Sequence, residues 1–373
     1  MRKRKIKTWL ITGVGVVFFA IILLVVFNTI APKPPVNKVI LARKSISSSR
    51  LYKAQNYIPL KYSGILKLYD SIMICWKIEN QRFFLKRDFS RVESLADKII
   101  ILSDELKSES KDKIRNLETL LIDDIGRLDE RTTRYDSVFK TVPLPENLIE
   151  KYTVGKLVFL ECKLAFESKN YTLASGKLQS ASDICNEVID SMRLRLCKYF
   201  ENHDQWVNLS NDAIKWSKRK KQSVLIIDKF AKACYLYTNG RLSDTFEIEL
   251  GPNWIGSKRH RGDNATPEGK YMVSKKFTNR ETKYYKALLL NYPNEEDQRR
   301  FNNEVNSGTL PKDSDIGGLI EIHGEGGKGF HWTNGCIALT NTNMDKVFKV
   351  SGIGTPVIVI GSLKNLSELY KLE

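Results

Sequence analysis

A histidine and a cysteine stand close together in a glycine-rich segment near the C-terminal end of this 373-residue chain. The segment Ile322–Leu339 opens on a strand-like stretch that ends at His323, crosses a glycine-rich loop and reaches Cys336 after a short turn. A cysteine attacks as its thiolate, and an imidazole within reach can take the thiol proton. These residue types predict acyl transfer, with Cys336 as nucleophile and His323 as base.

The turn before Cys336 suggests where a developing negative charge would be held. Gly335 lets the backbone come close to a substrate, and the N–H groups of Gly335 and Cys336 can point at an oxyanion. A lone cysteine near a histidine is more often structural. A zinc site built from Cys336, His323 and His331 is a rival, but no second cysteine lies at the expected spacing. We therefore expect no metal.

The charge of the chain is strongly positive and unevenly placed. The net charge is +17, and the first 222 residues carry most of it. Basic residues gather at 2–7 and at 215–221, but neither cluster belongs to a recognisable nucleic-acid-binding module. We expect no nucleic-acid partner.

An uncharged run near the N-terminus predicts a membrane anchor. Trp9–Ile30 holds 22 residues without a charge, which as a helix reach about 33 Å, enough to span a bilayer core. The basic residues before it predict that residues 1–8 form a cytoplasmic tail. A cleaved signal peptide is the alternative, but its apolar core is usually shorter. We expect a bacterial membrane protein with one span at 9–30, a lipid-bilayer partner and an extracytoplasmic catalytic domain.

Residues 31–221 predict an all-helical domain. Glycine and proline are scarce there, and apolar residues recur every three or four positions. Aromatic residues at three helix starts hint at helical repeats of the tetratricopeptide kind, and a plain bundle fits nearly as well. We expect a spacer or scaffold, with a protein partner as a further possibility.

From residue 222 to 363 the pattern changes to short strands and turns. Ser223–Asp228 and Ala233–Tyr237 read as strands, and Asn239-Gly240 is typical of a hairpin turn. Further strands are predicted at 245–250, 270–274, 319–322 and 356–360, with one helix at 342–350. We predict a mainly β domain here, followed by a tail at 364–373.

This region resembles the catalytic domain of the L,D-transpeptidases of the YkuD type. The motif of that family places a histidine, a spacer and then a hydroxyl residue shortly before a Gly-Cys pair. The matching positions are His323, Thr333, Gly335 and Cys336, together with the segments Gly262–Tyr271 and Gly354–Val357.

Two positions depart from the usual motif. Asn334 stands where the family has histidine, and Ala338 stands where it has arginine or asparagine. With the Asn291–Asn294 segment, this pattern looks like the YafK-like branch, which includes enzymes that hydrolyse links to the stem peptide. The resemblance leaves open whether the chain makes cross-links or cleaves them.

The resemblance implies a cysteine transpeptidase or hydrolase acting on peptidoglycan stem peptides. It implies a thioester on Cys336, formed at the L-centre of a diamino acid, with His323 as base and the Gly324 carbonyl orienting the imidazole. Gly335, Cys336 and Asn334 would hold the oxyanion. No cofactor is implied.

Six side chains are candidates for contact with the substrate, and each has an ordinary structural reading as well. They are Thr333, His331, Trp332, Tyr271, Tyr292 and Arg259. The alternatives to a transpeptidase are an amidase that releases amine-linked groups and a non-catalytic wall-binding scaffold.

Overall fold

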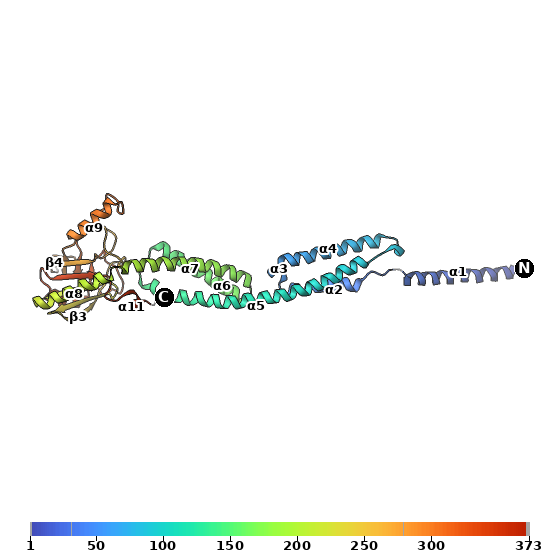
Figure 1. The fold of residues 1–373 in the computed structure, drawn as a ribbon, viewed down its shortest axis with the longest axis horizontal. Helices are drawn as coiled ribbons and strands as arrows, with labels where there is room; N and C mark the ends of the chain where they lie inside the picture. The colour runs from blue at the N-terminus through green and yellow to red at the C-terminus, as the bar shows by residue number, and fades with distance from the viewer. Residues whose placement is uncertain (1, 31, 279, 371–373) are drawn as a thin grey trace. The chain divides into compact units, whose positions relative to one another are not determined.

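The computed structural model describes residues 2–30, 32–278 and 280–370. Helices dominate the first 220 residues, and the strands follow (Figure 1). The helical half consists of α1 (Arg2–Ile30), α2 (Val36–Leu51), α3 (Ala54–Tyr57), α4 (Pro59–Gln81), the 3-10 turn η1 (Phe84–Lys86), α5 (Ser90–Thr141), α6 (Glu146–Glu167), α7 (Tyr171–Phe200) and α8 (His203–Lys220). The remainder consists of β1 (Ser223–Asp228), β2 (Ala233–Thr238), β3 (Arg241–Glu247), β4 (Gly269–Phe277), β5 (Ala287–Leu290), α9 (Glu295–Asn306), β6 (Glu321–His323), β7 (Ile337–Ala338), α10 (Asn341–Val350), β8 (Pro356–Ile360) and α11 (Leu366–Leu369).

The structure contradicts the predicted membrane anchor. Within the residues that the structure covers, none of the helices has both the length and the apolar character that crossing a bilayer requires. The predicted span at 9–30 is therefore wrong, and so is the membrane localisation that rested on it. The predicted bilayer partner loses its support. The side chains of the predicted tail at 1–8 lie outside those described.

The first of two compact units consists of residues 1–127 and 158–179. Its core shows why the segment folds as helix. Along α5 the buried positions Val92, Ala96, Ile99, Ser103 and Leu106 recur every three or four residues, which places them on one face of a helix. They pack into a core shared with α2 and α4. The prediction of a helical region is confirmed.

The second unit consists of residues 128–157 and 180–373 and contains an eight-stranded sheet. The strand order is β3-β2-β1-β8-β4-β5-β6-β7. The pairs β1–β8 and β6–β7 are parallel, and the other pairs are antiparallel. The apolar run of β1 lies buried between β2 and β8, as expected for an interior strand.

The predicted β-rich domain is present, with some differences in its elements. β1, β2, the hairpin at Asn239-Gly240, β8 and α10 lie where the sequence predicts them. The strand predicted at 245–250 begins earlier, because it continues the hairpin as β3. The sequence reading missed β5, β7 and α9.

Helix α8 lies against the sheet and packs on β1, β2 and β8 (Figure 1). Trp206 of α8 is buried and contacts Tyr199 and Phe200 of α7, and Phe200 in turn contacts the loop residue Phe230. Its indole lies so close to Gly361, just after β8, that a Cβ there would come within 2.3 Å of the ring. The aromatic cluster of the second unit therefore includes the helix that precedes the β-rich region.

Candidate active site

The pairing of β6 with β7 explains how His323 and Cys336 come together. The two strands run parallel, with Ile322 opposite Ile337 and His323 opposite Ala338. Continuing this register by one residue puts Cys336 beside Glu321. Side chains alternate between the two faces of a sheet, so Glu321, His323 and Cys336 share one face.

The imidazole of His323 is held in one orientation. It is fully buried, and its Nδ1 lies 2.6 Å from the Gly324 carbonyl oxygen. A carbonyl can only accept a hydrogen bond, so Nδ1 carries the proton and Nε2 keeps its lone pair. Nε2 has no hydrogen-bond partner among the described residues. This tautomer suits a general base.

Two aromatic side chains enclose the His323 ring. Tyr284, in the segment before β5, stacks on it with a centroid distance of 3.6 Å and an angle of 6° between the rings. Trp332 lies at 5.8 Å with its ring tilted by 68°. These contacts fix the plane of the imidazole and keep it away from bulk water.

Burial sets the resting protonation states of both residues. It lowers the pKa of His323 to about 4, although the hydrogen bond to Gly324 acts in the opposite direction. Burial also raises the pKa of the Cys336 thiol to about 11, and a backbone hydrogen bond from Glu321 opposes this. The thiol donates to the Leu319 carbonyl oxygen at 3.6 Å. At neutral pH the pair therefore rests as a neutral thiol and a neutral imidazole.

The turn before Cys336 requires glycine at Gly335. Its φ is +115°, and a Cβ there would come within 2.5 Å of the Ala265 carbonyl oxygen. The Thr333 hydroxyl closes the turn, since it donates to the Cys336 carbonyl oxygen at 2.7 Å and accepts from the Gly335 N–H at 3.3 Å. Because that N–H already has a partner, the Cys336 N–H is the stronger candidate for holding an oxyanion.

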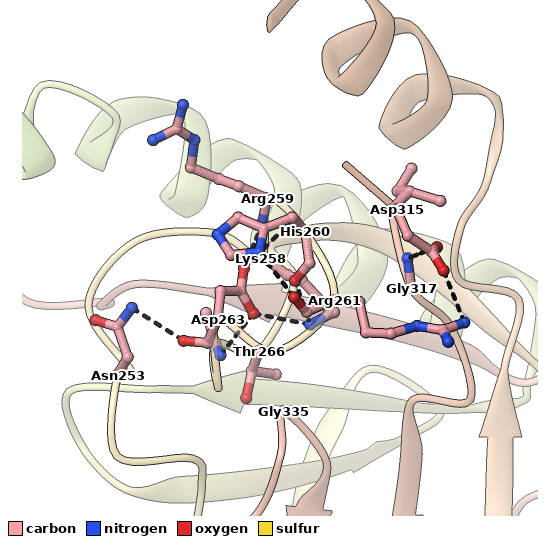
Figure 2. A network of polar contacts seen from close by, with 12 residues as sticks. Asn253, Lys258, Arg259, His260, Arg261, Asp263, Thr266, Asp315, Gly317 and Gly335 are labelled. Carbon is pink, nitrogen blue, oxygen red and sulfur yellow. Dashed lines mark hydrogen bonds and ion pairs between the residues drawn. The ribbon is translucent and has the colours of Figure 1, made fainter. Parts of the chain in front are cut away.

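Asp263 organises the loop that supports this turn. Its carboxylate accepts hydrogen bonds from the buried Lys258 ammonium at 2.8 Å and from the Ala265 N–H at 3.0 Å, as well as from the backbone N–H groups of Arg259 and His260. Burial disfavours its charge, but these donors outweigh burial and lower the pKa of Asp263. Figure 2 shows this network with Gly335 at its edge. The network keeps the Ala265 backbone in place against the nucleophile turn.

A buried lysine fixes the other end of the same loop. Lys229 is fully buried and donates to the carbonyl oxygens of Gly256 and Thr266 at 2.6 and 3.2 Å and to the Glu268 carboxylate at 2.6 Å. Burial lowers the pKa of Lys229, with the Glu268 charge opposing. The Thr-Pro-Glu-Gly segment, 266–269, is thus tied to the start of the sheet.

The glycine-rich loop between β6 and β7 is held by Glu249. This carboxylate accepts from the Gly329 N–H and from the Trp332 Nε1–H, both at 2.7 Å. Next to it, His331 accepts a hydrogen bond at Nδ1 from the Leu250 N–H at 3.1 Å. Burial lowers the pKa of His331 to about 4. In these contacts His331 and Trp332 shape the loop.

The remaining substrate-contact candidates separate into two groups. Asn334 is exposed at the tip of the turn, and Thr333 is buried beneath it. Tyr271 instead donates to Asp297 at 3.0 Å and packs against Tyr292. Tyr292 donates a hydrogen bond to the Ile316 carbonyl oxygen, and Arg259 donates one to the Glu304 carboxylate. None of these contacts of Tyr271, Tyr292 and Arg259 reaches His323 or Cys336.

Several residues that build the site were not singled out from the sequence. Tyr284 precedes β5, a strand that the sequence reading missed. Glu249 sits in a stretch without a motif, and Asp263 lies in the segment Gly262–Tyr271 but was not given a role there. Glu321 offered one signal, since it stands two residues before His323 and a strand places both on one face.

Within the described part of the chain, no three His, Cys, Asp or Glu side chains form a group that could hold a metal ion.

Comparisons with known proteins agree with this picture. Residues 222–359 match the family model described as YkuD, L,D-transpeptidase catalytic domain. Over 109 residues the chain is 29% identical to YafK of Escherichia coli strain K12, whose name assigns it provisionally to the L,D-transpeptidases. That alignment covers 29% of this chain and 37% of the relative. The same match occurs with YafK of Escherichia coli O157:H7.

Solved structures of L,D-transpeptidases are also similar to part of this chain. An L,D-transpeptidase from Mycobacterium smegmatis is 13% identical, with a TM-score of 0.25, over 38% of this chain and 59% of that one. L,D-transpeptidase 1 of Mycobacterium tuberculosis is 15% identical, with a TM-score of 0.24, over 38% and 62%. The family model confirms the resemblance predicted from the motifs, and the match covers residues 222–359.

Proposed function

We propose that this chain is a cysteine acyltransferase or hydrolase that acts on peptidoglycan stem peptides. One observation carries the proposal. His323 and Cys336 share a face of the paired strands β6 and β7, and the imidazole has the tautomer that a base requires. Both residues lie inside the segment that matches the L,D-transpeptidase family model.

In the first step of the proposed reaction, the Cys336 Sγ gives its proton to the His323 Nε2 as it attacks. The sulfur attacks the carbonyl carbon at the L-centre of a diamino acid in the stem peptide. The oxyanion then accepts hydrogen bonds from the Cys336 N–H, with Gly335 and Asn334 as further donors. When the tetrahedral intermediate collapses, the C–N bond breaks, His323 returns the proton to the leaving amine, and a thioester remains on Cys336.

A second acyl transfer releases the enzyme. An amine or a water molecule attacks the thioester carbonyl, His323 takes the attacking proton, and the C–S bond breaks. The proton then returns to the Cys336 sulfur. An amine from another stem gives a cross-link, and water gives a shortened stem.

The protonation states constrain the first step. Because the pKa is about 11 at the thiol and about 4 at the imidazole, a preformed thiolate–imidazolium pair is strongly unfavourable in the resting protein. We infer that the proton leaves the thiol as the sulfur attacks, when the oxyanion donors begin to stabilise negative charge.

Mass spectrometry of muropeptides tests the proposal. The full-length chain is incubated with stem tetrapeptides, and its products are compared with those of Cys336→Ala and of Cys197→Ala. Cys197 is an exposed cysteine on α7 and serves as the matched control. We expect the wild type and Cys197→Ala to change the substrate and to carry an acyl adduct on Cys336, and Cys336→Ala to do neither.

The products also separate the alternatives. New cross-links identify a transpeptidase, and shortened stems or released amines identify a hydrolase. If the wild type changes no substrate and gains no adduct, the proposal fails and the non-catalytic scaffold becomes the better explanation.

A further inference from the structure

Two side chains of opposite charge flank the candidate nucleophile, and the mechanism above uses neither. Glu321 lies beside Cys336 in the continued β6–β7 register and on the same face as His323. Lys283 stands next to Tyr284, the residue that stacks on His323. Its ammonium lies 4.9 Å from the centre of the Tyr284 ring. Glu321 therefore lies beside the thiol, and Lys283 lies beside the aromatic ring that stacks on the candidate base.

The pKa of the Cys336 thiol responds to both of these charges. The charge of Glu321 acts to raise the pKa of the Cys336 thiol, and that of Lys283 acts to lower it, with burial as the larger influence. Burial raises the pKa of the half-buried Glu321 carboxyl, and Lys283 opposes the rise. Both charges are thus close enough to affect the thiol.

Neither group forms an ion pair with any described residue, whereas two lysines nearby do. Lys286, three residues beyond Lys283, pairs with Asp345 at 2.5 Å. Lys258 likewise pairs with Asp263. A carboxylate kept half-buried and unpaired costs free energy, so a ligand that supplies its partner would bind well.

We propose that Glu321 and Lys283 together bind the amino acid on the amine side of the bond that is broken or formed at Cys336. Glu321 accepts a hydrogen bond from the N–H of that amino acid, and Lys283 binds its carboxylate. This inference rests on the proposed function and adds to it the two residues that bind the leaving or entering group.

The chemistry of the reaction explains the fit. In an amino acid the nitrogen and the carboxylate are attached to the same carbon, so both lie next to the reacting carbonyl. The leaving amino acid presents an amide N–H, and an attacking amino acid presents an ammonium group. A carboxylate at Glu321 accepts a hydrogen bond from either. A lysine ammonium binds a carboxylate as a point charge.

The test of Lys283 uses two stem tetrapeptides of the same sequence, one ending in a free carboxylate and the other in a carboxamide. The kcat/KM of the full-length chain is measured with each. We expect the wild type to prefer the carboxylate by about ten- to hundredfold, because a hydrogen bond to a charged group is worth that much. Lys283→Met should bring the ratio close to one, and Lys283→Arg should keep the preference.

The test of Glu321 uses inhibition by free D-alanine and by N-acetyl-D-alanine, which lacks the ammonium group. Wild type should bind D-alanine more tightly, and Glu321→Gln should lose that difference. Lys275→Met is the control, since Lys275 is exposed on β4, and it should leave both ratios unchanged. Thermal melting of each variant establishes that it is folded.

The possible outcomes distinguish a failure of this inference from a failure of the proposed function. If wild type forms no acyl adduct on Cys336, the proposed function fails. If the adduct forms but Lys283→Met slows both tetrapeptides equally, Lys283 acts only on the thiol and the inference is overturned. Equal rates of the wild type with both tetrapeptides would also overturn it.

Discussion

The chemistry of Cys336 and His323 depends on how strongly the fold removes them from water. An imidazole beside a thiol usually gives an ion pair when charges or a helix N-terminus stabilise the thiolate. Here burial favours the neutral forms of both groups, and Tyr284 and Trp332 enclose the imidazole. In the proposed mechanism, charge therefore develops only during attack on the substrate.

This arrangement predicts the pH dependence of cysteine alkylation. The thiolate is the reactive form, and burial raises the pKa of Cys336 to about 11. The rate of reaction with iodoacetamide should therefore be slow at pH 7 and rise about tenfold for each unit of pH up to about 10. Peptide mapping by mass spectrometry follows Cys336, with the exposed Cys197 as internal reference. A plateau in the Cys336 rate near pH 7 would show a preformed thiolate and contradict the assigned resting state.

At the scale of elements, the site depends on a turn that packs against a loop far away in sequence. Residues 333–336 rest on the backbone of Ala265, which the Asp263 network holds in place. The turn can therefore aim Cys336 only as long as the two backbones stay in contact.

Gly335→Ala tests this contact. The added Cβ would meet a backbone carbonyl oxygen at 2.5 Å, and φ is +115°. Because neither can adjust cheaply, we expect the variant to lose at least about a hundredfold in activity and to be destabilised by roughly 2–4 kcal/mol. Gly352→Ala is the matched control, since an added Cβ there meets nothing within 4 Å. Chemical denaturation and turnover are measured on both, and similar behaviour of the two variants would refute the argument.

At the scale of the whole molecule, the matched family segment and the compact unit do not begin at the same residue. The match starts at 222, whereas the compact unit that contains the sheet also takes in 180–221. Trp206 of α8 is buried, and it packs against Gly361 and the aromatic rings of Tyr199 and Phe200. The predicted boundary between 221 and 222 stays a prediction.

The packing of α8 predicts how truncated chains behave. A fragment from 222 to 373 loses the helix that covers β1 and β8, and burying a tryptophan contributes about 3–5 kcal/mol. We expect this fragment to melt at least about 10 °C below one from 180 to 373, given the usual relation between free energy and melting temperature for a domain of this size. Circular dichroism during heating compares the two. Equal melting temperatures would show that α8 is dispensable.

Much of the fold could be predicted from the sequence, and so could the resemblance of the β-rich region to the L,D-transpeptidase family. The periodicity of α5 specifies a helix because its buried residues recur every three or four positions. The β1 run and the Asn239-Gly240 turn specify strands and a hairpin because their signals are local. The His323 and Cys336 pair was found for the same reason, since its motif occupies one short segment.

Features of the site that depend on contacts between distant segments could be seen only in the tertiary structure. The roles of Tyr284, Glu249, Asp263 and Glu321 follow from strand register and loop packing, which no short window of sequence contains. The anchor prediction was wrong for a related reason, since a local count of apolar residues does not by itself establish a helix that spans a bilayer. Residue type and spacing thus determined which groups can react, and the packing around them determined their protonation and their partners.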